Sequence, residues 1–167
     1  MDEGFLLETA HLCLRGYRPK DVDLLAPMFA DPDHMRFYPS PFTREQTEAW
    51  VERQLQRYRD DGFGLWIVEG NATDEFLGTA GPTVQMVEGV REVEIGWHVR
   101  PGRKGRGIAP EAGAVARDWA FVTLEVDHVI SLVRPGERCL GPGRREARDA
   151  GGPRGGARGV PAPRLPR

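Results

Sequence analysis

An abrupt change of composition at residue 135 constrains the fold of this 167-residue chain more than any other feature. Up to Arg134, apolar segments with strand or helix spacing alternate with turn residues. In residues 135–167, Gly, Pro and Arg fill 22 of 33 positions, and large apolar side chains are almost absent. Such a segment cannot bury enough apolar surface to offset the entropy lost on ordering. We therefore expect an ordered domain over residues 1–134 and a disordered tail over residues 135–167.

The charge distribution marks the same boundary. Residues 1–134 carry 15 basic and 22 acidic side chains, whereas residues 135–167 carry 8 basic and 3 acidic ones. The first segment is long enough for one domain with a real core. The chain has no apolar run of about 18 residues, and its acidic start, MDEGFLLETA, lacks the features of a signal peptide. Cys13 and Cys139 make no disulfide framework. We expect a cytoplasmic protein without a membrane partner.

Hydrophobic periodicity predicts the order strand, helix, helix, three strands, helix, strand. The predicted strands cover residues 11–18, 64–70, 75–88, 91–100 and 127–133. The predicted helices cover residues 19–31, 41–62 and 110–124. Thr43 and Gln46 have the spacing of a capping box, and Gly62 can end the second helix. This order predicts an α/β domain with a mixed sheet, in which the three consecutive strands form an antiparallel meander.

A glycine-rich turn, KGRGIA, joins the strand at 91–100 to the helix at 110–124. Pro110 suits the first position of that helix. Free main-chain N–H groups at a helix N-terminus attract anions, and Gly105 and Gly107 let a phosphate approach the backbone. Positive charge is added by Arg103, Lys104 and Arg106. The turn therefore predicts a phosphate site, although a basic loop that only caps a helix has the same residues. It has neither the P-loop nor the dinucleotide-binding spacing.

The segment KGRGIAPEAG, following EVEIGWHVRP, resembles the GNAT superfamily of N-acetyltransferases. HLCLRGYRPKDVD, FLGTAG and EIGWHV are similar to its branch of RimJ-type and RimL-type ribosomal-protein N-acetyltransferases. The resemblance covers roughly residues 6–134. It implies the acyl-CoA N-acyltransferase fold, acetyl-CoA as cosubstrate and an amine acceptor. In this family, the loop that here contains residues 33–43 usually shapes the acceptor pocket, although core packing of its aromatic side chains is an equal explanation.

The resemblance also implies which residues bind acetyl-CoA. Main-chain groups of His98 and Val99 would pair with the pantetheine arm as an added strand would. Main-chain amides of the turn would hold the pyrophosphate. The residues of that turn are Lys104, Gly105, Arg106, Gly107, Ile108 and Ala109.

Direct acetyl transfer needs a deprotonated amine, a polarised thioester and a proton for the leaving thiolate. Strand alternation puts Glu92 and Glu94 on one face, so either carboxylate could accept the ammonium proton. Glu94 is the first candidate and Glu92 the second, while a solvated strand position is the alternative for each. The four histidines, His11, His34, His98 and His128, lack metal-site spacing, and we assign no metal.

The resemblance further implies a segment of the form RPENxASxxVAEKLGM after HVISLV, where this chain has RPGERCLGPGRREARDAGG. A choice of synonymous codons for this tail, read with one G removed after Pro135, gives RPENVASGRVAEKLGMRVDREVEHA. We therefore expect a single-base insertion near codons 135 and 136, which makes the domain C-terminally incomplete and puts the tail out of frame. The source nucleotide sequence tests this directly.

Two other functions are open for the printed chain. A domain that lacks its last elements could bind CoA without catalysing transfer. The Arg- and Gly-rich tail could bind RNA, but it lacks interleaved aromatic side chains, and the frameshift explains its composition without a nucleic-acid partner. A protein N-terminus, an antibiotic and a polyamine all present a primary amine, and the residues do not select one of them as the acceptor. The residues do not indicate an oligomeric state either.

Overall fold

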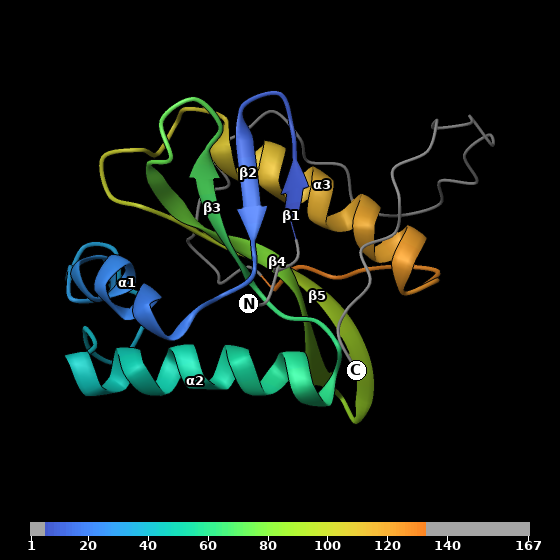
Figure 1. The fold of residues 1–167 in the computed structure, drawn as a ribbon. Helices are drawn as coiled ribbons and strands as arrows, with labels where there is room; N and C mark the ends of the chain where they lie inside the picture. The colour runs from blue at the N-terminus through green and yellow to red at the C-terminus, as the bar shows by residue number, and fades with distance from the viewer. Residues whose placement is uncertain (1–5, 133–167) are drawn as a thin grey trace.

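A five-stranded sheet, in which every strand pairs antiparallel with its neighbours in sequence, forms the centre of the molecule (Figure 1). The computed structural model describes residues 6–132. The strands are β1 (Leu6–Glu8), β2 (Leu12–Arg15), β3 (Trp66–Gly70), β4 (Phe76–Val87) and β5 (Val90–Val99). The helices are α1 (Val22–Phe29), α2 (Arg44–Asp60) and α3 (Ile108–Thr123), and the 3-10 turn η1 (Pro19–Asp21) precedes α1.

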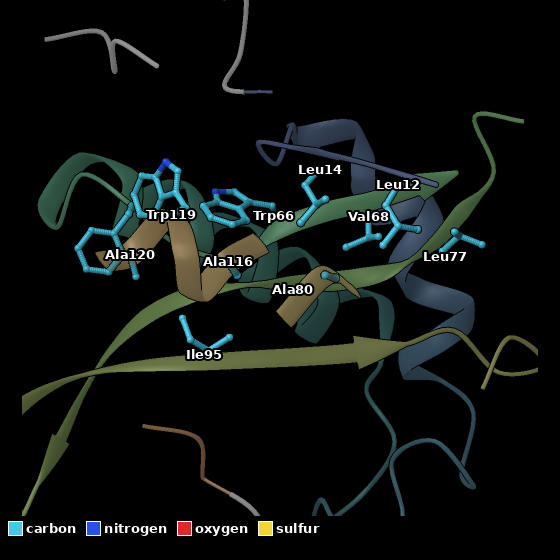
Figure 2. Close-up of a cluster of buried hydrophobic side chains, with 12 residues drawn as sticks. Leu12, Leu14, Trp66, Val68, Leu77, Ala80, Ile95, Ala116, Trp119 and Ala120 are labelled. Carbon is cyan, nitrogen blue, oxygen red and sulfur yellow. The ribbon is translucent and has the colours of Figure 1, made fainter. Parts of the chain in front are cut away.

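Each face of the sheet has its own apolar core. Figure 2 shows the core between the sheet and α3, to which both Trp66 and Ile95 contribute. The core on the other face contains Ile67 and packs against α1 and α2. Trp66 and Ile67 are neighbours in β3, so strand alternation sends them to opposite faces. The antiparallel meander from β3 to β5 is confirmed, and the α/β class agrees with the helices that pack on the sheet. The parallel pairing that a mixed sheet requires is present in the described residues only as the bridge between Glu94 and Ile130.

Local sequence signals explain where α2 begins and ends. Thr43 Oγ1 accepts a hydrogen bond from the Gln46 N–H at 3.2 Å, and Gln46 Oε1 accepts one from the Thr43 N–H at 2.8 Å. This reciprocal pair is the predicted capping box. Gly62 follows the helix with φ +81°, a left-handed conformation that glycine adopts without steric cost.

A buried ion network fixes α1 against the sheet. The guanidinium of Arg15 donates two hydrogen bonds of 2.9 Å to Asp21, and it also donates to Glu69. Burial alone would lower the pKa of Arg15, but the bonds to these two carboxylates outweigh that effect and raise it. Because Arg15 is on β2, Asp21 on η1 and Glu69 on β3, the network holds the start of α1 at one end of the sheet.

Three elements differ from the sequence prediction. Strand β1 was missed, because three residues are too few for alternation to reveal a strand. Helix α3 begins at Ile108, so Pro110 is at its third position rather than its first. It still lies in the first turn, where its missing N–H costs no helical hydrogen bond.

The strand predicted over residues 127–133 is the third difference. In its described part, Ile130 forms a single parallel bridge with Glu94. Residue 133 and the tail over residues 135–167, on which the frameshift expectation depends, lie outside the described residues.

Candidate active site

The turn between β5 and α3 presents a row of unpaired main-chain amides. Gly105 and Gly107 adopt left-handed φ values of +78° and +81°, which turn the chain sharply into the helix. Among residues 6–132, no N–H group from Lys104 to Ala109 has a hydrogen-bond partner. A Cβ atom at either glycine would meet no atom within 4 Å, so the space above the turn is open. These amides and the positive end of the α3 dipole form an environment suited to an anion.

The basic side chains of this turn are not equivalent. Arg103 pairs with Glu75 at the start of β4, which Arg100 also contacts at 3.2 Å. Two guanidinium groups therefore share the single carboxylate of Glu75, and this group of three side chains keeps one net positive charge beside the turn. Lys104 and Arg106 are exposed on the turn. A depression of about 370 Å³ lies beside the turn, lined by His11, Leu12, Glu75, Leu77, Arg103, Arg106, Ile108 and Glu111.

Strand β5 leads directly into this turn and has an open edge. The Ile95 N–H donates to the Ile130 carbonyl at 2.8 Å, away from β4, whereas the Arg100 N–H donates to Leu77 at the start of β4. Main-chain direction alternates along a strand. Trp97 and Val99 therefore direct their N–H and C=O groups to the open edge, and His98, which is in register with Thr79, directs its groups toward β4.

A glycine keeps β4 close to β5 at this end of the strand. Gly78 has φ +150°, and a Cβ atom there would lie 2.1 Å from the His98 carbonyl oxygen. No other residue fits this position without moving one of the two backbones. The close approach fixes the part of β5 whose opposite edge is open.

The two candidate carboxylates extend from the same face of β5, the face that α1 and α2 cover. Glu94 Oε2 accepts a hydrogen bond of 2.7 Å from Gln85 and lies 3.5 Å from the Thr83 hydroxyl. Glu92 Oε2 lies 2.8 Å from His128 Nε2. Both carboxylates therefore have polar partners, and Glu94 is held by neutral donors alone.

His98 extends from that same face into a cluster of aromatic rings. Its ring centroid lies 5.6 Å from that of Phe29, 5.7 Å from that of His34 and 5.8 Å from that of Trp50. His98 Nε2 lies 3.4 Å from the hydroxyl of Tyr38. Burial in this cluster, reinforced by His34, lowers the pKa of His98 to about 4, so its imidazole is neutral at physiological pH.

Gly96 separates His98 from Glu94 along this face. A Cβ atom at Gly96 would meet only the Leu65 side chain, at 3.9 Å, so there is space beside the strand between the two side chains. Sequence reasoning missed this space, the Trp97 edge and the side chain of His98. Strand alternation could have identified Gly96 and His98, because residues two and four positions from Glu94 lie on the same face of the strand.

No helix among residues 6–132 is long and apolar enough to cross a membrane. Within the same residues, no group of three or more His, Cys, Asp and Glu side chains is arranged to hold a metal ion.

Comparison with known proteins relates this geometry to a family. A family model described as an acetyltransferase (GNAT) domain matches residues 11–138. The uncharacterized protein YkkB of Bacillus subtilis is 32% identical over 134 residues, which cover 80% of this chain and 78% of YkkB. The uncharacterized N-acetyltransferase p20 of Bacillus licheniformis is 28% identical, over 77% of this chain and 73% of p20.

Among solved structures, an acetyltransferase of Agrobacterium tumefaciens superposes with a TM-score of 0.70 and 29% identity. The match covers 80% of this chain and 77% of that protein. The RimL-type ribosomal L7/L12 acetyltransferase has a TM-score of 0.57 at 13% identity, which shows a shared fold. The family match includes the amide-lined turn and the open edge of β5. This chain belongs to the GNAT acetyltransferase family.

Proposed function

We propose that this protein is an acetyl-CoA-dependent N-acetyltransferase that moves the acetyl group directly to a primary amine. Membership of the GNAT family supports the use of acetyl-CoA in acyl transfer. The observation that carries the proposal is the position of the unpaired amides, which follow directly on the open edge of β5. An anion site and an open strand edge therefore lie next to each other. Acetyl-CoA combines a pyrophosphate with an amide-containing arm, and those two features are suited to its parts.

The cosubstrate would lie along β5. Its pyrophosphate would accept hydrogen bonds from the amides of residues 104–109. Its pantetheine arm would pair with the main chain of Trp97 and Val99, as an added strand does. Trp97 replaces His98 in this proposal because the His98 main chain is directed toward β4. The thioester would then lie beside Gly96, between Glu94 and His98.

Glu94 is the proposed general base, and Glu92 is the second candidate. Glu94 is nearer to the space beside Gly96, whereas Glu92 is paired with His128. In the proposed reaction the amine gives a proton to Glu94, directly or through water, and its nitrogen attacks the thioester carbon. The Trp97 N–H at the open edge would donate a hydrogen bond to the tetrahedral oxyanion, while the Trp97 carbonyl and Val99 pair with the pantetheine arm.

We also propose the RimJ/RimL-like branch, with a protein N-terminus or a small-molecule amine as acceptor and the cytoplasm as location. The motifs near β2 and β5 support the branch. The acceptor would enter from the face covered by α1 and α2, where the loop over residues 33–43 borders the aromatic cluster around His98.

A single-base insertion near codons 135 and 136 is the proposed origin of the tail, with residues 1–134 as the family domain. The family match supports this proposal, because it ends at residue 138 of 167. Exposed apolar side chains near the end of the described residues support it further, since a following helix and strands would cover them. These side chains are Phe121, Val122 and Leu132. A domain that binds CoA without catalysing transfer is the second candidate function. It applies only to the chain as printed, not to the chain restored by removing the inserted base.

Acetyl transfer to a panel of primary amines, detected as acetylated product by mass spectrometry, tests the proposed function. Removing the base should lower turnover by about 10²-fold or more, so Glu94→Gln is the test variant. Glu52→Gln is the matched control, because Glu52 makes an exposed ion pair with Arg59 on α2. If neither the printed chain nor the chain restored by removing the inserted base acetylates any amine, the proposal is wrong. Equal turnover of the two variants would exclude Glu94 as the base.

A further inference from the structure

Arg57, on α2, is a half-buried arginine whose guanidinium forms no ion pair or hydrogen bond among residues 6–132. Burial lowers the pKa of Arg57, and the nearby carboxylates of Asp61 and Glu94 oppose that effect. Asp61 forms its own ion pair with Arg91. Glu94 accepts its hydrogen bond from Gln85. A partly desolvated guanidinium without a counter-ion favours an anion from outside the chain.

Two contacts show how α2 lies along β5. The ring of Trp50 contacts His98, with the two centroids 5.8 Å apart. Asp61, directly after the end of α2, accepts a hydrogen bond of 2.7 Å from Arg91 near the start of β5. Helix α2 therefore runs antiparallel to β5, and Arg57 lies between these two contacts.

Gln54 lies between Trp50 and Arg57 on the same side of α2, because residues three or four positions apart share a side of a helix. Four helical residues and two strand residues both advance the chain by about 6 to 7 Å, so Gln54 is opposite Gly96. Gln54 is 1% exposed, and its Oε1 atom has no hydrogen-bond partner in the described part of the chain. An amide oxygen buried without a donor is costly, so this place favours a ligand that supplies an N–H group.

The charges on this face leave an excess of positive charge. Asp61 is already paired with Arg91, and Glu94 is the proposed acceptor of the amine proton. Arg57 then has no anion, and the exposed side chain of Arg53 adds a second positive charge nearby. A polyamine would bring like charge to this place and would be repelled. A carboxylate would supply the missing charge, and its two oxygens match the planar fork of a guanidinium.

We propose that Arg57 determines acceptor specificity, and that the acetylated amine carries a carboxylate close to its amino group. Free amino acids and protein N-termini with an acidic first residue share this chemistry. The inference rests on the proposed acetyl transfer and narrows its acceptor. Arg57 binds the carboxylate, Gln54 Oε1 accepts a hydrogen bond from the amine, and Glu94 accepts the amine proton.

Pairs of acceptors that differ in one charged group test this selection and distinguish its two sources. Alanine is compared with alaninamide, and aspartyl-glycinamide is compared with asparaginyl-glycinamide. In at least one pair, kcat/KM for the carboxylate should exceed that for the carboxamide by about 30-fold. A preference in the first pair identifies a free amino acid, and a preference in the second identifies an acidic N-terminus. Spermidine should be a poorer acceptor than the preferred carboxylate.

Arg57→Gln should reduce this ratio of kcat/KM values to near one, mainly through KM for the carboxylate, because binding rather than chemistry is lost. The ratio compares two acceptors on the same protein, so a smaller folded fraction of the variant does not change it. Arg59→Gln is the matched control, because Arg59 is on the same helix in an exposed ion pair with Glu52. It should keep the ratio of the unchanged chain.

The variants are made in the full chain, both as printed and as restored by removing the inserted base. Equal kcat/KM values within both acceptor pairs, or a ratio that Arg57→Gln leaves unchanged, would overturn the inference while acetyl transfer itself stands. Acetylation of no acceptor by either unchanged chain would instead refute the proposed function, and this inference with it.

Discussion

Burial among aromatic rings gives His98 a pKa of about 4, well below its ordinary value of 6.5. Between these two pH values the unfolded chain binds a proton at this side chain and the folded chain does not. The free energy of unfolding therefore falls as the pH falls from 6.5 toward 4. The shift corresponds to at most about 3 kcal/mol, and the partial exposure of His98 reduces it.

Urea unfolding at about pH 7 and pH 4.5 measures this effect, with His98→Gln as the comparison. The unchanged chain should lose about 2 kcal/mol more than the variant across this range, because Gln does not titrate. Equal losses would show that another group, such as His34, carries the acid sensitivity. The pKa of His34 is also lowered, mainly by burial, and both chains keep it.

Single side chains were partly predictable from the sequence. Alternation correctly grouped Glu92 and Glu94 on one face, because side-chain direction in a strand depends only on parity. It could not identify the partners of these carboxylates. Gln85 is on another strand and His128 follows α3, so their approach depends on the register of β4 and on the chain's return past β5.

Helix α3 and the turn before it contain the predicted anion site, and two glycines of that turn allow a matched test. Gly102 and Gly107 have φ values of +79° and +81°, and a Cβ atom at either would meet no atom within 4 Å. Replacement by Ala should cost about 1 kcal/mol of unfolding free energy at each position, because of the left-handed backbone.

The two replacements should differ in CoA binding. Gly107 is the N-cap of α3, and a methyl group there would crowd a pyrophosphate held by the amides of residues 104–109. Gly107→Ala should weaken CoA binding by about tenfold or more in a calorimetric titration, and Gly102→Ala should leave it nearly unchanged. A similar loss of affinity in both variants would place the pyrophosphate elsewhere.

Long elements were predictable because they carry many periods of their pattern. The meander from β3 to β5 and helix α2 with its capping box follow the expected order closely. Short or nonlocal features were not predictable. Strand β1 depends on pairing with β2, and the start of α3 at Ile108 depends on the left-handed Gly107 rather than on Pro110.

At the level of the whole chain, a sheet with two cores ends at an open edge of β5. The family match ends at residue 138, near the composition change at residue 135. If the following helix and strands are lost through a frameshift, the apolar side chains Val122 and Leu132 remain exposed. Exposed apolar surface and open strand edges favour aggregation, so the printed chain should be less soluble than the restored chain.

Calorimetric titration of CoA into the printed and the restored chains tests the central claim most directly. The restored chain, which reads RPENVASGRVAEKLGM after HVISLV, should bind CoA in a one-to-one complex. Its affinity should be about tenfold or more above that of the printed chain, because the restored helix would complete the cofactor site. No binding by the restored chain would contradict the assignment of an acetyl-CoA site to this turn and strand edge. Equally tight binding by both chains would contradict the role given to the missing segment.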